Sequence, residues 1–333
     1  MKGYFFFFLM VFGYFSGFGQ MFKSEMDTTY IRLYPNTIKV KGIFLDRYFD
    51  LRLKEKGYDP IVKLAAREQS YFGIGVTVWN LNLDLASLIP NPLEKQQLGE
   101  EDGFDIQLSL YTRRWILDAA VERIENFNLK NTELLEDAEN ELSPINNLGV
   151  RRIVFGSSYI FHPEKFSFRS AFIQVDRQLK SAGSPILSFN YTYLSIKSDS
   201  LFTPSSIDED LLEPLATRAH RFALQPGYSY NFIYKAWFLN TTATAGFDVQ
   251  RVWYDIDNLS NTQWKVHPQF DLQGGIGYNS DTFSAGVLVF YEFGRTRISD
   301  LVINTNRGGL RVFAAYRFPA PQFVRKTKPK FLD

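Results

Sequence analysis

The chain of 333 residues contains no cysteine and only three histidines. Without cysteine there are no disulfide bonds, thiolate metal ligands, cysteine nucleophiles or lipid-modified N-terminal cysteine. An excess of one charge is also lacking, because 37 lysines and arginines are balanced by 36 aspartates and glutamates. A nucleic-acid-binding protein normally shows a basic excess or stripe. We therefore expect no nucleic-acid partner, and we predict neither a metal site nor a cofactor.

Aromatic residues, by contrast, are abundant: 32 phenylalanines and 18 tyrosines contribute to an aromatic fraction of 17%. This fraction is far above that of an ordinary soluble enzyme. The length is compatible with two soluble domains or with one large β-barrel. Beyond the N-terminus, no stretch is long and apolar enough to form a transmembrane helix.

The N-terminus has the pattern of a secretory signal peptide. Lys2 supplies the positive charge, an apolar run follows from Tyr4 to Phe15, and Ser16, Gly17 and Gly19 provide small residues for cleavage. An apolar run of about 12 residues is short for a membrane anchor, which needs roughly 20. We predict that residues 1–19 are removed and that the protein is exported.

After residue 40 the dominant hydrophobic period is two, as in the segments 70–78, 103–111 and 308–318. Successive side chains of a strand point to opposite faces, so each segment has one apolar and one polar face. A soluble β-sandwich would give the same alternation, and the choice between the two architectures depends on three further features.

The first feature is the alternation of short turns with long polar connections, which is the layout of a transmembrane barrel. The second is an aromatic girdle, since every tryptophan lies at the end of a predicted strand. The third is that the polar faces carry charges that a dry sandwich core would not accept unpaired. The short turns are Trp79-Asn80, Arg113-Arg114, Tyr234-Lys235 and Asn279-Ser280, and the long connections are 89–102, 126–147, 198–217 and 295–307. The girdle tryptophans are Trp79, Trp115, Trp237, Trp253 and Trp264.

We predict an all-β fold, a transmembrane antiparallel β-barrel of about 12 strands, with 10 to 14 acceptable. Thirteen candidate segments conflict with the even number expected of such barrels. Either 166–178 or 184–197 is then not an independent span, or a crossing has been missed. The predicted organisation is a signal peptide (1–19), an N-terminal periplasmic segment (20–40), the barrel (41–318) and a periplasmic tail (319–333).

Four segments resemble a known family: Phe166–Phe172, Asp176–Ser184, Leu110–Trp115 and Arg311–Phe318. Together they resemble the domain-of-unknown-function family 4421 of Bacteroidota, over nearly the whole mature chain. The resemblance implies an exported outer-membrane barrel and no established activity. The expected partners are outer-membrane lipid, the barrel-assembly machinery and a small polar solute.

The charged residues on the polar phase of the predicted strands are the candidates for the barrel interior. They could pair with one another in a structural interior, or line a selective pore or a pocket for a charged solute. The predicted lumen residues are Asp46, Asp50, Arg52, Asp84, Asp105, Asp118, Glu122, Arg221, Asp248, Asp271, Arg311 and Arg317.

Two further features have alternative interpretations. The small-residue motif Lys180, Ser181, Ala182, Gly183 and Ser184 is either a tight turn or a loop folded into the lumen.

The histidines His220 and His267 open predicted strands, and each has aspartates in nearby loops. Their spacing gives no Ser-His-Asp signature.

The sequence therefore favours an outer-membrane barrel that is not an enzyme, either a narrow pore or a structural or partner-binding barrel. The alternatives are a barrel-embedded lipid hydrolase or acyltransferase with one of these histidines as base, and a soluble periplasmic β-sandwich.

Overall fold

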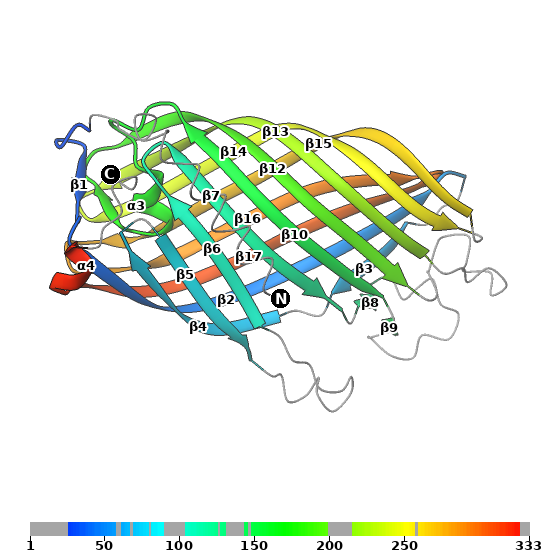
Figure 1. The fold of residues 1–333 in the computed structure, drawn as a ribbon, viewed down its shortest axis with the longest axis horizontal. Coiled ribbons are helices and arrows are strands. Elements are labelled where there is room, and N and C mark those ends of the chain that lie inside the picture. The colour runs from blue at the N-terminus through cyan, green and yellow to red at the C-terminus, as the bar shows by residue number, and fades with distance from the viewer. Residues whose placement is uncertain are drawn as a thin grey trace.

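A computed structural model gives the arrangement of the chain (Figure 1). It describes residues 26–57, 61–66, 69–79, 81–89, 104–125, 127–130, 143–145, 148–198, 215–256 and 259–326. The predicted signal peptide therefore lies outside the described residues. None of the described helices is long and apolar enough to cross a membrane.

Twelve antiparallel strands form one sheet that closes on itself, which confirms the predicted fold (Figure 1). The ring closes where the last strand pairs with the first, from Leu301 opposite Glu55 to Pro319 opposite Thr37. A single closed sheet excludes the two packed sheets of a β-sandwich. In ring order the strands are β2 (Thr37–Glu55), β4 (Gln69–Val78), β5 (Leu81–Leu88), β6 (Phe104–Tyr111), β7 (Trp115–Ile124), β10 (Gly149–Ile160), β12 (Ala182–Ser198), β13 (Leu215–Tyr234), β14 (Trp237–Ile256), β15 (Leu259–Asn279), β16 (Phe283–Ile298) and β17 (Leu301–Pro319).

Short turns join strand pairs at one end of the barrel, which we call the turn end; the opposite end is the loop end. The outer wall between them is apolar, and large side chains such as Phe72, Val121 and Leu224 are exposed on it. The alternation of the strands therefore places one apolar face outside, where a lipid environment would cover it.

The predicted long connection 295–307 is wrong. β16 continues to Ile298 and β17 begins at Leu301, so only Ser299 and Asp300 separate the two strands. The polar residues of this region pair across the strands; Arg295 Nε donates to Asn304 Oδ1 at 2.8 Å. Polar character here marks an extended hairpin rather than a loop.

The odd strand number has a structural explanation. Residues 166–178 do not form a span; they contain the short helix α3 (Phe168–Phe172) and β11 (Asp176–Gln178), whereas 184–197 lies within β12. β11 pairs with β1 (Ile31–Leu33) at the turn end (Figure 1). The Ser167 side chain caps α3 by accepting a hydrogen bond from the Ser170 amide, which turns the chain away from an extended path.

Both ends of the barrel differ slightly from the predicted limits 41 and 318. β2 already begins at Thr37, and β17 ends at Pro319. The helix α4 (Gln322–Lys326) follows, and Trp79 Nε1 donates to the Val324 carbonyl at 3.2 Å. This contact holds the start of the predicted tail against the β4–β5 turn.

A small branch of the sheet arises at the loop end. The part of β2 nearest this end pairs with β3 (Val62–Ala66). β3 pairs in turn with β8 (Phe127–Leu129), and β8 pairs with β9 (Ser143–Ile145). The branch therefore places residues 127–129 and 143–145 of the predicted 126–147 loop next to the barrel, near the loop end of β2.

Candidate functional site

The inward side chains of β2 show that the lumen is layered rather than uniformly polar. Lysines lie nearest the turn end, an apolar pair follows, an arginine lies in the middle, and an apolar run extends to the loop end. In order, these residues are Lys39, Lys41, Ile43, Leu45, Arg47, Phe49, Leu51 and Leu53.

At the turn end, residues 166–178 fill the lumen, and we call them the plug. Two asparagines of the inner wall donate to plug carbonyls: Asn231 Nδ2 to Ser167 at 2.9 Å and Asn279 Nδ2 to Ser170 at 3.1 Å. These bonds come from β13 and β15, so the plug is fixed to two strands of the wall.

Two cations of the wall hold the end of α3. Lys39 Nζ donates to Gln174 Oε1 at 3.1 Å, and Arg317 Nη2 donates to the Gln174 carbonyl at 2.5 Å. These bonds come from β2 and β17, the strands at which the barrel closes. All three side chains are buried. The predicted lumen residue Arg317 thus serves to hold the plug.

The plug also has a folded interior of its own. The Arg169 guanidinium contacts the Asp176 carboxylate at 2.6 Å, and both side chains are buried. Phe168 and Phe172 stack with ring centroids 4.2 Å apart, and Phe168 also stacks on Tyr111 of the wall at 6.3 Å. The plug is therefore a packed element of the lumen.

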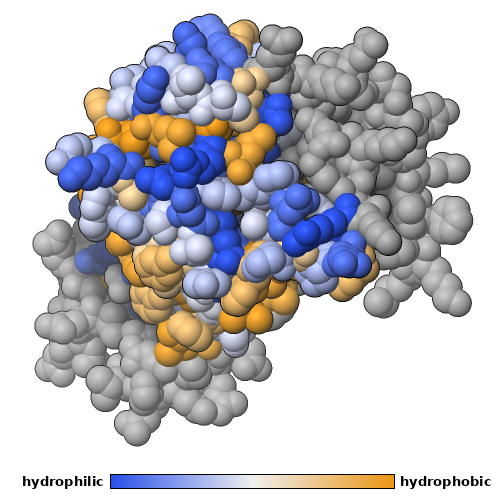
Figure 2. Space-filling view, turned by 90° about the vertical axis from the view of Figure 1, so that its left-hand side faces the viewer, coloured by the Kyte–Doolittle hydropathy of each residue, from blue (hydrophilic) through white to orange (hydrophobic). Residues whose placement is uncertain are grey.

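Outside the plug, a cluster of four residues ties β1 and β11 to the β15–β16 turn. Asp281 accepts hydrogen bonds from Tyr34 Oη at 2.6 Å, Arg32 Nη1 at 2.9 Å and Arg177 Nη1 at 3.0 Å. Led by the Tyr34 hydrogen bond, these contacts lower the pKa of the Asp281 carboxyl to about 2. Figure 2 looks onto this end of the barrel, where hydrophilic side chains gather between apolar ones.

Next to the plug, on its side toward the loop end, lies a cavity of about 300 Å³, which we call the chamber. Its walls include Phe168 and Phe172 of the plug, and Asp118 and Asn190 of the strands. Glu122 and Arg307 also border it, and they belong to the next layer of the lumen.

That layer is a network of five charged residues, which we call the central network. Arg152 contacts Glu122 at 3.1 Å on the neighbouring strand and Glu292 at 2.7 Å on β16. Arg307 of β17 also contacts Glu122, and Arg47 Nη1 lies 3.7 Å from it. The network therefore joins β7 and β10 to β2, β16 and β17 across the lumen.

Two smaller ionic groups lie in the same interior. Arg221 contacts Asp248 at 2.6 Å, and both side chains are buried. Asp84 contacts Lys41 at 2.8 Å and Arg311 at 3.0 Å. Opposite charges buried in this way are stable only as pairs, so these groups form a cross-linked interior.

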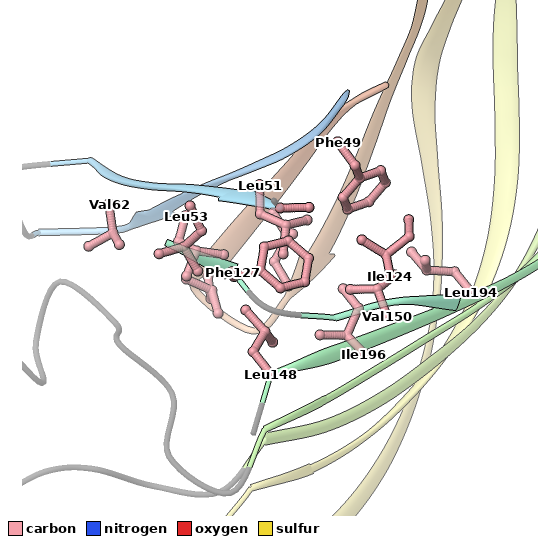
Figure 3. Close-up of a cluster of buried hydrophobic side chains, with 14 of the residues drawn as sticks. Phe49, Leu51, Leu53, Val62, Ile124, Phe127, Leu148, Val150, Leu194 and Ile196 are labelled. Atoms are coloured by element: carbon pink, nitrogen blue, oxygen red, sulfur yellow. The ribbon is translucent and has the colours of Figure 1, made fainter. Parts of the chain in front are cut away.

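The loop end is closed by apolar side chains, which we call the seal (Figure 3). Phe127 of β8 is completely buried, and its ring packs edge-on against Phe49 at 6.2 Å. Inward residues from the ends of most strands surround this pair. The seal comprises Phe49, Leu51, Leu53, Val62, Leu64, Ala66, Ile124, Phe127, Leu129, Leu148, Val150, Leu194, Ile196, Ala219, Val252, Ile298, Leu301 and Ile303.

The structure places eight of the twelve predicted lumen residues on inward positions and brings most of them into these ionic groups. They are Asp84, Asp118, Glu122, Arg221, Asp248, Asp271, Arg311 and Arg317. Asp271 accepts from Gln225 Nε2 at 2.8 Å. Asp105 lies in β6, but its side chain is outside the described residues.

The inward assignment of Asp46, Asp50 and Arg52 is wrong, because these residues occupy the outward phase of β2. Asp46 accepts from Ser70 Oγ at 3.0 Å, and Asp50 lies 3.9 Å from Lys130. The reason is that the seal and the layer above the plug are apolar, so the apolar phase of β2 faces inward there.

Among the described residues, at least six charged side chains of the lumen were not predicted from the sequence. Arg152 and Arg307 occupy inward positions of strands whose alternation was visible, so a full phase assignment of β10 and β17 would have found them. The missed residues are Lys39, Lys41, Arg47, Arg152, Glu292 and Arg307.

The motif Lys180–Ser184 is neither a tight turn nor a lumen loop, because Ala182 begins β12 and pairs with Asn231. Ser181 Oγ accepts from the Ile233 amide at 2.9 Å, and Ser184 Oγ accepts from the His162 amide at 2.9 Å. The segment that enters the lumen is the plug, which precedes this motif.

The tryptophans lie at both ends of the barrel wall. Trp79, Trp115 and Trp237 lie at the turn end, whereas Trp253 and Trp264 lie at the loop end. A membrane-interface role for these side chains remains a prediction.

The two candidate histidines lie on opposite faces of the wall. His220 points outward, and its Nδ1 is 2.8 Å from Tyr191 Oη. His267 lies opposite Asp248 in the strand register, and its Nε2 has no hydrogen-bond partner among the described residues. In the described part of the chain we find no Ser-His-Asp set around either histidine. The same residues contain no group of three potential metal ligands.

The closed ring of antiparallel strands with an interior plug defines a β-barrel of the transmembrane type. Residues 25–318 match the family described as Domain of unknown function (DUF4421), and the chain belongs to this family. No curated protein matches the chain.

Similar solved structures include three proteins of low sequence identity. The outer membrane protease OmpT from Escherichia coli is 8% identical with a TM-score of 0.42, over 85% of this chain and 97% of that one. Ail from Yersinia pestis is 12% identical with a TM-score of 0.23, over 82% and 97%. The toluene transporter TodX from Pseudomonas putida is 10% identical with a TM-score of 0.27, over 85% and 90%. At such scores these likenesses indicate no activity of this chain.

Proposed function

We propose that this protein is a non-enzymatic outer-membrane barrel that does not conduct in its resting state and acts as a structural or partner-binding barrel. The observation that carries this proposal is the closure of the lumen at both ends, by the plug at the turn end and by the seal at the loop end. Each closure consists of several packed, buried side chains. Neither is a single side chain that narrows an otherwise open pore.

The proposed location is supported by three features. The N-terminal sequence has the pattern of an export signal, the outer wall is apolar, and both ends of the barrel sequence lie at the turn end. In bacterial barrels the short turns and both termini face the periplasm. The loop end then faces the outside, and the barrel would be inserted by the barrel-assembly machinery.

The chamber favours a second candidate, a narrow pore that opens on a signal. Its polar walls and its volume of about 300 Å³ could hold a small polar solute between the two closures. The hydrolase or acyltransferase alternative has no comparable support, because His220 points outward to Tyr191 and His267 lacks a hydroxyl partner in the described residues.

The test is single-channel conductance of the refolded protein, residues 20–333, in a planar bilayer. We expect no channel conductance from the folded protein. Folding is checked by the change of electrophoretic mobility on heating that a folded barrel shows. Steady conductance proportional to salt concentration would overturn the resting-state closure and support the pore.

A further inference from the structure

Five cations lie in a row on the outer wall at the loop end, on five consecutive strands of the ring. The strands are β7, β10, β12, β13 and β14, which run side by side in Figure 1. All five side chains are exposed. The cations, which we call the basic row, are Arg123, Arg151, Lys197, Arg218 and Arg251.

The strand register places neighbouring members of the row close together. Arg151 lies directly opposite Arg123 on one side and opposite Ser195 on the other, and Ser195 lies opposite Arg218. Neighbouring strands are about 4.8 Å apart. Arg151 and Arg218 therefore flank the small residue Ser195 on the same face of the sheet. A groove of about 640 Å³ is lined by these residues together with Lys197.

The row marks the boundary of the apolar wall. On several of these strands, outward positions nearer the turn end are large and apolar: Val121 on β7, Phe155 on β10 and Phe222 on β13. A molecule bound here would have its charged part at the row and an apolar part along the wall below.

Aromatic side chains lie among the cations. The Arg251 guanidinium lies 4.6 Å from the Trp253 ring and 5.8 Å from the Trp264 ring. Tyr193 and His220 lie opposite each other in the register, with ring centroids 5.2 Å apart. Aromatic rings at this depth are typical of the interface between apolar chains and polar headgroups.

The opposite side of the barrel differs in charge. On the outward face of β2, Asp46 and Asp50 precede Arg52 and Lys54 toward the loop end, and Arg52 lies opposite Lys63 of β3. Among the described residues, one acidic side chain contacts the row: Glu125 lies 2.6 Å from Arg123. Among the described residues, the row therefore combines five cations with one acidic contact, whereas the β2 side mixes charges of both signs.

We propose that the basic row binds the phosphate groups of an anionic glycolipid headgroup in the surrounding leaflet, with the acyl chains along the apolar wall below. Arginine donors match phosphate oxygens in pairs, and basic residues next to a membrane attract anionic lipid. The assignment to the outer leaflet rests on the proposed orientation, whereas binding itself does not.

The experiment is a titration of the full chain in detergent micelles with diphosphorylated lipid A, followed by native mass spectrometry. Dephosphorylated lipid A is the matched probe. The variant is Arg151→Gln/Arg218→Gln, and the control Arg52→Gln/Lys54→Gln removes the same charge from β2. We expect the row variant to weaken binding of the phosphorylated lipid by at least about tenfold and the control by less than about twofold.

Equal binding of the two lipids, or an unchanged affinity in the row variant, would overturn the proposal. An acidic protein or an acidic loop would then be the alternative partner of the row. Equal losses in both variants would also overturn it, because attraction would then depend on net charge alone. The titration requires neither bilayer insertion nor a closed lumen, so its failure is distinguishable from conductance in the bilayer test.

Discussion

Arg152 and Glu292 contact each other at 2.7 Å across the lumen, although 140 residues separate them in the sequence. Arg152 also contacts Glu122 on its own side of the barrel. The pair therefore links two walls that backbone hydrogen bonds connect only around the ring. A barrel cross-linked in this way resists changes of its cross-section.

Arg152→Ala removes this link and leaves the buried carboxylate of Glu122 and the partly buried carboxylate of Glu292 short of a cation. Loss of one partner of a buried pair costs about 3 kcal/mol or more in the free energy of unfolding. Urea unfolding in micelles would measure the change. Arg297→Ala is the matched control, because Arg297 is exposed and lies 3.8 Å from exposed Asp300, a pair of the kind that contributes at most about 1 kcal/mol. Equal costs in the two variants would contradict the role of the network.

Gly294 makes room for a second ionic contact. A Cβ at this position would lie 2.7 Å from Arg221 Nη2 and 2.7 Å from Thr305 Oγ1. Gly294→Ala should therefore displace the Arg221 guanidinium from the buried carboxylate of Asp248. We expect a cost of about 2 kcal/mol or more, since the buried charge loses its partner.

A double-mutant cycle separates this effect from a general change in the strand. Adding Gly294→Ala to Arg221→Ala should cost less than Gly294→Ala alone, because the side chain that it displaces is already gone. Unfolding free energies measured in urea would decide. Additive costs would show that the alanine acts on β16 itself.

Much of the fold could be predicted because period-two alternation and short turns are local signals. The inward phase of β7, β13 and β17 followed from single charges such as Glu122, Arg221 and Arg311 within apolar strands. β2 was different. Its two faces both carry large apolar residues, such as Ile43 inside and Phe44 outside, so alternation could not indicate which face was inward.

The plug and the central network could not be predicted for a different reason. Phe166 and Phe168 imitate the alternation of a strand, although they pack into the lumen. The contact of Arg152 with Glu292 depends on how the sheet closes, and no local pattern contains that information. The layers of the lumen therefore became visible only with the closed barrel.

The cluster around Asp281 gives a prediction about pH. Its pKa is lowered to about 2 from the ordinary value of 3.8, mainly by the Tyr34 hydrogen bond. A lowered folded-state pKa stabilises the folded state above pH 3.8, and this contribution is lost as pH falls toward 2. The protection factors of the β1 amides, which correct the exchange rate for its intrinsic pH dependence, should therefore fall in that window. In Asp281→Asn the protection factors should already be lower at neutral pH and change less on acidification.

Arg177→Gln would serve as a second variant in the same measurement, because Arg177 contacts Asp281 from β11 at 3.0 Å. It should lower the protection factors at neutral pH and retain part of their acid dependence through Tyr34 and Arg32. An acid dependence that is identical in wild type and Asp281→Asn would exclude Asp281 as its source.

The plug and the seal close the lumen in series, which leads to a prediction about conductance. Phe127→Ser should loosen the seal, because the completely buried ring is replaced by a small polar group. Arg317→Ala should loosen the plug, because it removes the 2.5 Å bond to the Gln174 carbonyl. Each variant alone should stay silent in a planar bilayer, since the other closure remains.

The double variant should show openings, provided that its mobility on electrophoresis still changes on heating. Each single variant is its matched control, and Phe127→Ser is expected to lower the unfolding free energy by about 3 kcal/mol or more. Conductance in either single variant would mean that the other element does not block ions. Silence in a folded double variant would place the barrier in the central network, where Arg47, Arg152 and Arg307 surround Glu122. Two closures in series thus predict that conductance appears only when both are loosened. A lumen blocked at a single level would conduct once that one closure is loosened.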